Sequence, residues 1–200
     1  MSAKVERIIL AGFGGQGVLF LGRLLAEAAL KADKNVSWVP SYGYEIHTPT
    51  ANCSLIIAEN QIASPMITVP DSVIAMNTPS LNKFSQKIKG GGMLMYNSSL
   101  IDRQEFRDDI RLVEIPATDM ANDLGDPSLA SLVMAGAYAK FSNLVTYEGV
   151  EEALRKLLEK QRIKEDAINL NIEALKQGFK YVEETRYMSG RYAHAVFRGI

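Results

Sequence analysis

The feature that most constrains the fold is a cluster of four glycines directly after a run of strand-forming residues. The segment VERIIL (5–10) leads into LAGFGGQGV (10–18), and apolar residues then recur at helical spacing up to about Lys31. An apolar, β-branched run that ends at glycine is typical of a buried strand, and apolar positions three and four residues apart are typical of a helix face. The chain therefore opens with a strand, a tight turn and a helix, as α/β sheets do.

Three of these glycines fit the pattern G-x-G-x-x-G. In that pattern Gly12 permits the tight turn, Gly14 lets another group approach the backbone, and Gly17 lets the helix pack closely on the strand. The free N–H groups at the start of a helix form an anion site. The candidate cofactor-binding loop consists of Gly12, Gly14, Gly15, Gln16 and Gly17.

Two interpretations of this glycine loop stay open, because the rest of a dinucleotide fingerprint is weak. An acidic residue that binds ribose should close the second strand about 20 residues further on. Here that strand closes with WVPS (38–41), and Glu45 comes later, in a polar segment. A P-loop is excluded because Val18, rather than Lys-Ser or Lys-Thr, follows Gly17. The loop is either an anion or nucleotide site, or a structural turn that lines an interface.

Strand-like and helical segments alternate along the chain, and the last third is helical. We expect strands at 5–11, 35–40, 50–59, 71–77, 93–97 and 110–116, the last of the sheet. We expect helices at 16–31, from Thr78, and at 128–142, 147–160 and 165–184, with a short helical turn near 117–124. Thr78 is the expected cap of the second helix, with Pro79 in its first turn. This order predicts a single three-layer, Rossmann-like α/β domain with a mixed or mostly parallel sheet. We expect the domain to span 1–185 and a C-terminal tail to span 186–200.

A second polar cluster lies in the segment VPSYGYEIHTPTANCSLIIAENQIASP (39–65). We expect a surface loop that runs into a half-buried strand. Many hydrogen-bonding groups beside a glycine turn indicate a contact surface, and an ordinary polar loop is the alternative. The candidate contact residues are Ser41, Tyr42, Glu45, His47, Thr50 and Asn52.

Composition excludes several classes of function. The chain has 22 basic and 23 acidic residues, which gives no reason to expect nucleic acid or an anionic membrane as partner. No apolar run approaches the roughly 20 residues of a membrane span, and we see no signal peptide, so we expect a cytoplasmic protein. The single cysteine, Cys53, excludes a disulfide within the chain, a cluster held by four thiolates and a Cys-rich zinc site. We expect Cys53 to be a small core residue. No Ser-His-Asp triad or metal-ligand set is apparent, since His47 and His194 lie far apart.

Taken together, GFGGQGV (12–18), SYGYE (41–45), TANC (50–53) and IASP (62–65) resemble the gamma subunit of the 2-oxoacid:ferredoxin oxidoreductases. The resemblance continues through IPATDMANDLG (115–125), LASLVMAGAYAK (129–140) and INLNIEALKQGFKYVEE (168–184), so it covers residues 4–184. The chain departs from the family pattern at Tyr44, which replaces a proline, at His47-Thr48-Pro49, which replace Arg-Gly-Gly, and at Ser131, which replaces an asparagine.

The resemblance implies a subunit of an oxidoreductase that converts a 2-oxoacid and CoA into acyl-CoA and carbon dioxide, with electrons passed to ferredoxin. The family uses thiamine diphosphate, magnesium and iron–sulfur clusters, and the resemblance places these on alpha, beta and delta partner subunits. The segment LGDPS (124–128) has only the Gly-Asp of a thiamine diphosphate motif. We therefore expect no complete active site and no cofactor bound by this chain alone, with a phosphate of the co-substrate CoA as the ligand implied at the glycine loop.

Two other functions remain as alternatives. One is a stand-alone protein that binds a nucleotide or dinucleotide at the glycine loop. The other is a structural dimerisation module, which would form a homodimer when isolated.

Overall fold

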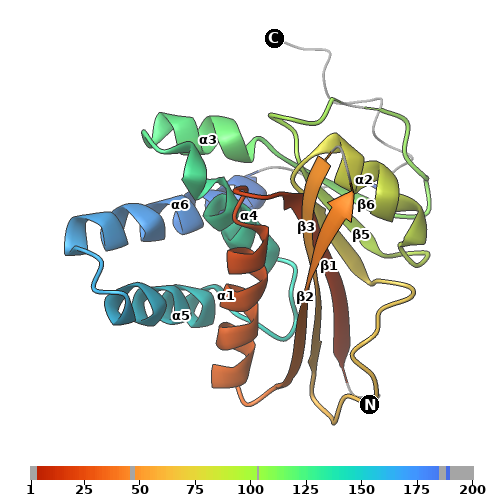
Figure 1. Ribbon diagram of the computed structural model, residues 1–200, viewed down its shortest axis with the longest axis horizontal. Coiled ribbons are helices and arrows are strands. Elements are labelled where there is room, and N and C mark those ends of the chain that lie inside the picture. Colours follow the sequence, from red (N-terminus) through yellow and green to blue (C-terminus); the bar gives the residue numbers. More distant parts are fainter. Residues whose placement is uncertain (1–3, 46–47, 103, 185–187, 190–200) are drawn as a thin grey trace.

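The computed structural model describes residues 4–45, 48–102, 104–184 and 188–189. In this part of the chain seven strands form one sheet in the order β2-β3-β1-β4-β5-β6-β7 (Figure 1). The strands are β1 (Val5–Phe13), β2 (Asn35–Glu45), β3 (Thr48–Ala58), β4 (Ser72–Ala75), β5 (Met93–Asn97), β6 (Arg111–Ile115) and β7 (Met188–Ser189). The helices are α1 (Val18–Lys31), α2 (Thr78–Phe84), α3 (Ala117–Asp123), α4 (Ala130–Ala139), α5 (Tyr147–Lys160) and α6 (Glu165–Glu184), with two short 3₁₀ helices at Ser85–Lys87 and Pro127–Leu129.

The sheet is mixed, which confirms the predicted α/β class. Strands β1, β4, β5 and β6 are parallel to one another, whereas β3 pairs antiparallel with both β1 and β2, and β7 pairs antiparallel with β6. Because β3 reverses direction between them, β2 and β1 run the same way. The end of β2 and the start of β3 therefore meet the carboxyl end of β1.

Two apolar cores lie on opposite faces of the sheet and give it three layers. Ile8 and Leu10 of β1 face a large core with α1, α4, α5 and α6. Ile9 and Ala11 face a smaller core with α2 and the segment that follows β5. Successive residues of a strand point to opposite faces, so this alternation follows directly from the sequence of β1.

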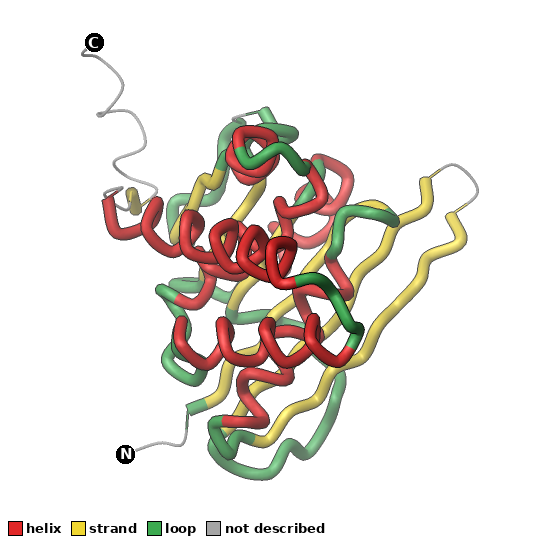
Figure 2. Tube along the Cα trace, turned by 90° about the vertical axis from the view of Figure 1, so that its left-hand side faces the viewer, coloured by secondary structure: helices red, strands yellow, loops and turns green. Residues whose placement is uncertain are grey.

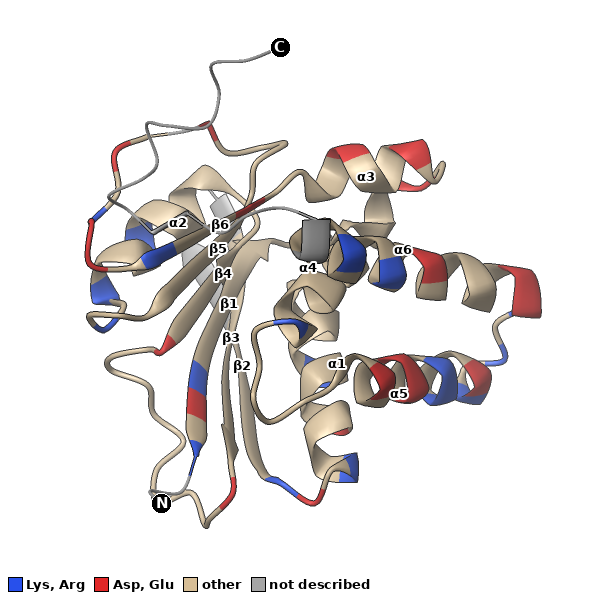
Figure 3. Cartoon of the chain, turned by 180° about the vertical axis from the view of Figure 1, so that it is seen from behind, with Lys and Arg blue, Asp and Glu red and all other residues tan. Residues whose placement is uncertain are grey.

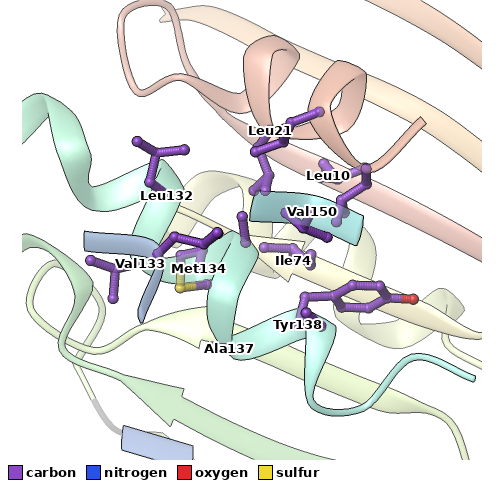
Figure 4. Close-up of a cluster of buried hydrophobic side chains, with 14 of the residues drawn as sticks. Leu10, Leu21, Ile74, Leu132, Val133, Met134, Ala137, Tyr138 and Val150 are labelled. Carbon is purple, nitrogen blue, oxygen red and sulfur yellow. The ribbon is translucent and has the colours of Figure 1, made fainter. Parts of the chain in front are cut away.

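Helix α4 lies at the centre of the larger core and is buried on all sides. Figure 4 shows its side chains among those of α1, β1, β4 and α5. A helix that is apolar all round needs protein on every face. The sheet and α1 cover one side of α4, and α6 covers another.

The structure corrects three expectations. Residues 41–45 continue β2 instead of forming a loop, and β3 begins at Thr48, so the polar segment forms the arms of a β-hairpin. Figure 2 shows this hairpin reaching past the neighbouring strands. Strand 110–116 is not the last, because Met188–Ser189 pair with Arg111 and Leu112. The cap of α2 is Asn77 rather than Thr78, since the Asn77 side chain accepts a hydrogen bond from the Ser80 N–H at 2.9 Å. The remainder of the predicted tail lies outside the described residues.

Candidate functional site

The glycine turn joins the end of β1 to the start of α1. Two of its glycines have left-handed backbone conformations, with φ of 90° at Gly15 and 71° at Gly17. The sequence pattern assigned the tight turn to Gly12, but Gly12 does not have a left-handed conformation. The pattern could not show this, because a motif fixes the spacing of glycines and not their dihedral angles. Gly14 and Gly15 face open space, since a Cβ added at either position would have no atom of the chain within 4 Å. A ligand can therefore approach the backbone at these two residues.

The other two glycines are needed for packing. A Cβ at Gly12 would lie 2.7 Å from Val18 and 2.9 Å from Met76. A Cβ at Gly17 would lie 2.4 Å from the Ser131 hydroxyl of α4. Gly17 thus lets the turn pack against α4, and not against the strand as the pattern suggested, because α4 fills the core beside α1.

Gln16 fixes the turn to the next parallel strand. Its Oε1 accepts hydrogen bonds from the Phe13 N–H at 2.7 Å and from the Asn77 side-chain amide at 3.0 Å. Its own amide donates to the Met76 carbonyl at 3.2 Å. Sequence reasoning missed Asn77, although its preference for helix caps and its spacing from Ser80 were a usable signal. The Gln16 side chain therefore holds the turn in place from inside the fold.

The amino end of α1 has uncapped N–H groups. The first helical hydrogen bond runs from the Leu21 N–H to the Gly17 carbonyl at 2.8 Å, so the N–H groups of the preceding helical residues have no acceptor within the helix. No side chain caps the helix and no acidic residue lies in its first turn. The positive end of the helix dipole therefore points towards the open side of Gly14 and Gly15.

The candidate contact residues lie on strands beside this turn. Thr50 is opposite Phe13 and Asn52 is opposite Ala11 in the β1–β3 pair. Ser41 is in turn opposite Asn52, Tyr42 opposite Ala51, and Glu45 opposite Thr48 towards the tip of the hairpin. The predicted His47 lies outside the described residues. The pairing thus brings Thr50 and Asn52 next to the end of β1 that leads into the glycine turn, with Ser41 one strand further away.

Cys53 is a core residue, as expected. Its side chain is fully buried under α1, and its thiol donates to the Val18 carbonyl at 3.8 Å. Burial raises the pKa of this thiol to about 12. Thiolate chemistry at Cys53 is therefore excluded at neutral pH.

The part of the chain that the structure describes contains no cluster of three or more His, Cys, Asp or Glu side chains suited to a metal ion. Among the same residues, no helix combines the length and apolar character needed to cross a membrane. The fold and the site define an α/β domain in which an open glycine turn at the start of a helix lies beside a β-hairpin.

The chain belongs to the pyruvate ferredoxin/flavodoxin oxidoreductase family, whose model matches residues 7–181. It is 32% identical to the ketoisovalerate oxidoreductase subunit VorA of Methanothermobacter thermautotrophicus, over 89% of this chain and 36% of that protein. It is 30% identical to the 2-oxoglutarate synthase subunit KorC of Methanocaldococcus jannaschii, over 74% of this chain and 81% of that protein. The chain therefore spans about a third of VorA but most of KorC.

A solved structure supports the same family. The fold matches the gamma subunit of a keto/oxoacid ferredoxin oxidoreductase from Geobacter sulfurreducens with a TM-score of 0.75 and 26% identity, over 90% of this chain and 99% of that one. The family resemblance drawn from the sequence motifs is therefore confirmed.

Proposed function

We propose that this chain is the gamma subunit, or gamma-type domain, of a 2-oxoacid:ferredoxin oxidoreductase. In this role it supports the CoA-dependent oxidative decarboxylation of a 2-oxoacid, with electrons passed to ferredoxin. The observation that carries the proposal is the family match over residues 7–181, which includes the glycine turn, the β2–β3 hairpin and the central helix.

The described residues of this chain hold no cluster of side chains suited to a metal ion, and their one cysteine is buried with a raised pKa. They therefore offer no set of thiolate ligands for an iron–sulfur cluster. The family also uses thiamine diphosphate and magnesium. We propose that alpha, beta and delta partners carry these cofactors, and that the chain is inactive alone. A cytoplasmic location is part of the proposal, since a single free thiol suits a reducing compartment.

The test is to purify the chain with an affinity tag after co-expression with the products of neighbouring reading frames. The expected complex contains stoichiometric thiamine diphosphate and iron, and it reduces ferredoxin only when both a 2-oxoacid and CoA are supplied. Turnover by the isolated chain would overturn the proposal. So would a flavin or nicotinamide bound at the glycine turn, which would favour the stand-alone dinucleotide-binding alternative.

We further propose that the glycine turn binds a phosphate of CoA. The open backbone at Gly14 and the uncapped start of α1 support this site. Binding would use the backbone of Gly12, Gly14, Gly15 and Gly17, with Gln16 holding the turn in place, and Ser41, Tyr42, Glu45, His47, Thr50 and Asn52 would form the neighbouring contact surface.

Gly14→Ala tests the site, because the added methyl group meets no atom of the chain and would fill only the space of the ligand. In the complex we expect CoA affinity to fall at least about tenfold, while thermal unfolding stays unchanged. Gly90→Ala is the matched control, since Gly90 lies just before β5 at the opposite end of the sheet. Unchanged CoA affinity in Gly14→Ala would remove the phosphate site.

A further inference from the structure

The β2–β3 hairpin and the segment after it are depleted of charge. Charged residues make up 22% of the chain, yet Glu45 and Glu59 are the only ones between Asn35 and Pro70. Figure 3 shows β2 and β3 tan over most of their length. Depletion of charge is the compositional mark of a protein–protein interface core.

One face of this hairpin is open over part of its length, although Ile56 on that face is buried. Helix α1 covers one side of β2 and β3, whereas α2 on the other side contacts β1 and β4. The strand register places Val39 and Ser54 in line with Ile9, and Ser41 and Asn52 in line with Ala11, on the α2 side. We call Ser37, Val39, Ser41, Asn52 and Ser54 the hairpin face. Val39 is 43% exposed there, and Ser41 is exposed as well.

The hairpin face ends at the free edge of the sheet. Strand β2 is the edge strand and carries no charged side chain before Glu45, whereas Pro40 interrupts its row of backbone donors. Proline on an edge strand discourages pairing with another strand, so a partner is expected on the face and not along the edge. A face with few charged side chains and an exposed Val39 is expected of a surface that is covered in the assembled protein.

We propose that the hairpin face docks the polypeptide that carries thiamine diphosphate in the oxidoreductase. This inference rests on the function proposed above. The face borders the glycine turn through the Asn52–Ala11 and Thr50–Phe13 pairs, so a chain seated on it reaches the turn. A second copy of this chain could also cover this face, but it would not supply the cofactors that the proposed reaction needs.

The relatives favour an occupant from the same enzyme over a second copy of this chain. The chain matches about a third of VorA, where the remainder belongs to the same polypeptide, and most of KorC. The same domain thus occurs both joined to further polypeptide and nearly alone. A domain that occurs nearly alone needs a non-covalent surface to stay beside the rest of the enzyme.

The test places a lysine on the hairpin face of the full complex. We expect Val39→Lys to lower the thiamine diphosphate that co-purifies with the tagged chain at least about tenfold. Leu30→Lys is the matched control, since Leu30 is 55% exposed near the end of α1, and it should leave co-purification unchanged. Ser41→Lys is a second variant on the exposed edge, used if Val39→Lys alters the melting temperature of the isolated chain.

Each outcome decides one of the two proposals. Wild-type complex without thiamine diphosphate contradicts the proposed function itself. Wild-type and hairpin variants that retain thiamine diphosphate equally contradict only the docking surface. A wild-type chain that is dimeric by light scattering, and becomes monomeric on Val39→Lys without loss of thiamine diphosphate, would assign the face to a second copy and overturn the inference.

Discussion

Gly136 of α4 and Gly178 of α6 lie where the two helices touch backbone to backbone. A Cβ at Gly136 would lie 1.8 Å from the Leu175 carbonyl oxygen, and a Cβ at Gly178 would lie 1.9 Å from the Val133 carbonyl oxygen. No side chain fits in that space. The pair lets α6 close over the most apolar helix of the fold, and it explains a glycine in the middle of each helix despite the conformational cost.

Replacing Gly136 with alanine should therefore destabilise the protein severely. We expect a loss of about 3 kcal/mol or more, because the clash is with backbone that cannot rotate away. Urea unfolding followed by circular dichroism measures this loss. Gly149→Ala in α5 is the control, since its Cβ would approach only Thr146 at 3.3 Å, and it should change stability by less than about 1 kcal/mol. Equal stabilities would show that α4 and α6 are further apart.

The Gln16–Asn77 hydrogen bond should appear as a coupling energy between the glycine turn and α2. Each single alanine substitution leaves partly buried polar groups without partners and should cost about 1–3 kcal/mol. In a double-mutant cycle, Gln16→Ala with Asn77→Ala should cost less than the sum, with a coupling of at least about 0.5 kcal/mol. Losses of unfolding free energy that simply add would contradict an energetic coupling between Gln16 and Asn77.

Glu6 should stabilise the packing of β1 against the end of α4 and the segment that follows it. Its carboxylate accepts hydrogen bonds from the Tyr138 hydroxyl at 3.1 Å, the Ser142 hydroxyl at 2.8 Å and the Asn143 N–H at 2.6 Å. We expect Glu6→Ala to lower the unfolding free energy by about 2 kcal/mol. Glu27→Ala, which removes only a surface pair with Arg23, should cost less than about 0.5 kcal/mol. Chemical denaturation of both variants under the same condition measures the two losses, and equal losses would contradict the stabilising role of Glu6.

The Cys53 thiol should make the protein less stable in alkali. Burial raises its pKa from the ordinary 9.0 to about 12. Above pH 9 the unfolded thiol ionises while the native thiol stays neutral, so its stabilising contribution is complete below that pH and is lost as the pH rises towards 12. Between about pH 9 and about pH 12, ionisation of the Cys53 thiol in the unfolded state should lower the unfolding free energy by about 1.4 kcal/mol per pH unit.

Comparing wild type with Cys53→Ala isolates this effect, because burial also raises the pKa of Tyr138, which both proteins share. Urea unfolding at several values between about pH 8 and about pH 11 should give a shallower pH dependence for the variant. Parallel curves for the two proteins would show that the native thiol ionises as readily as the unfolded one.

Local sequence patterns were sufficient to predict the bounds of an element where that element is long and has one apolar face. Helices 147–160 and 165–184 have the predicted bounds, because their apolar residues repeat at helical spacing over several turns. The sequence also located the glycine turn and its strand and helix, since glycine, apolar run and helical period occur in order.

Long-range pairing was not visible in the sequence. Ser41-Tyr42-Gly43 has the composition of a loop, yet it is a strand because Asn52, Ala51 and Thr50 lie opposite it. Strand β7 has two residues, too few to show any period. The roles of Gly12 and Gly17 depended on Met76 and on Ser131, neighbours in space that no spacing rule identifies.

The enclosure of α4 also bears on how the protein is made. Its ten residues are buried by elements from both ends of the chain, and α6 begins only at Glu165. While the ribosome is still adding α6, the face of α4 that meets Gly178 has nothing to cover it. The larger core can therefore close only after α6 has been synthesised, and until then the nascent chain exposes its most apolar helix.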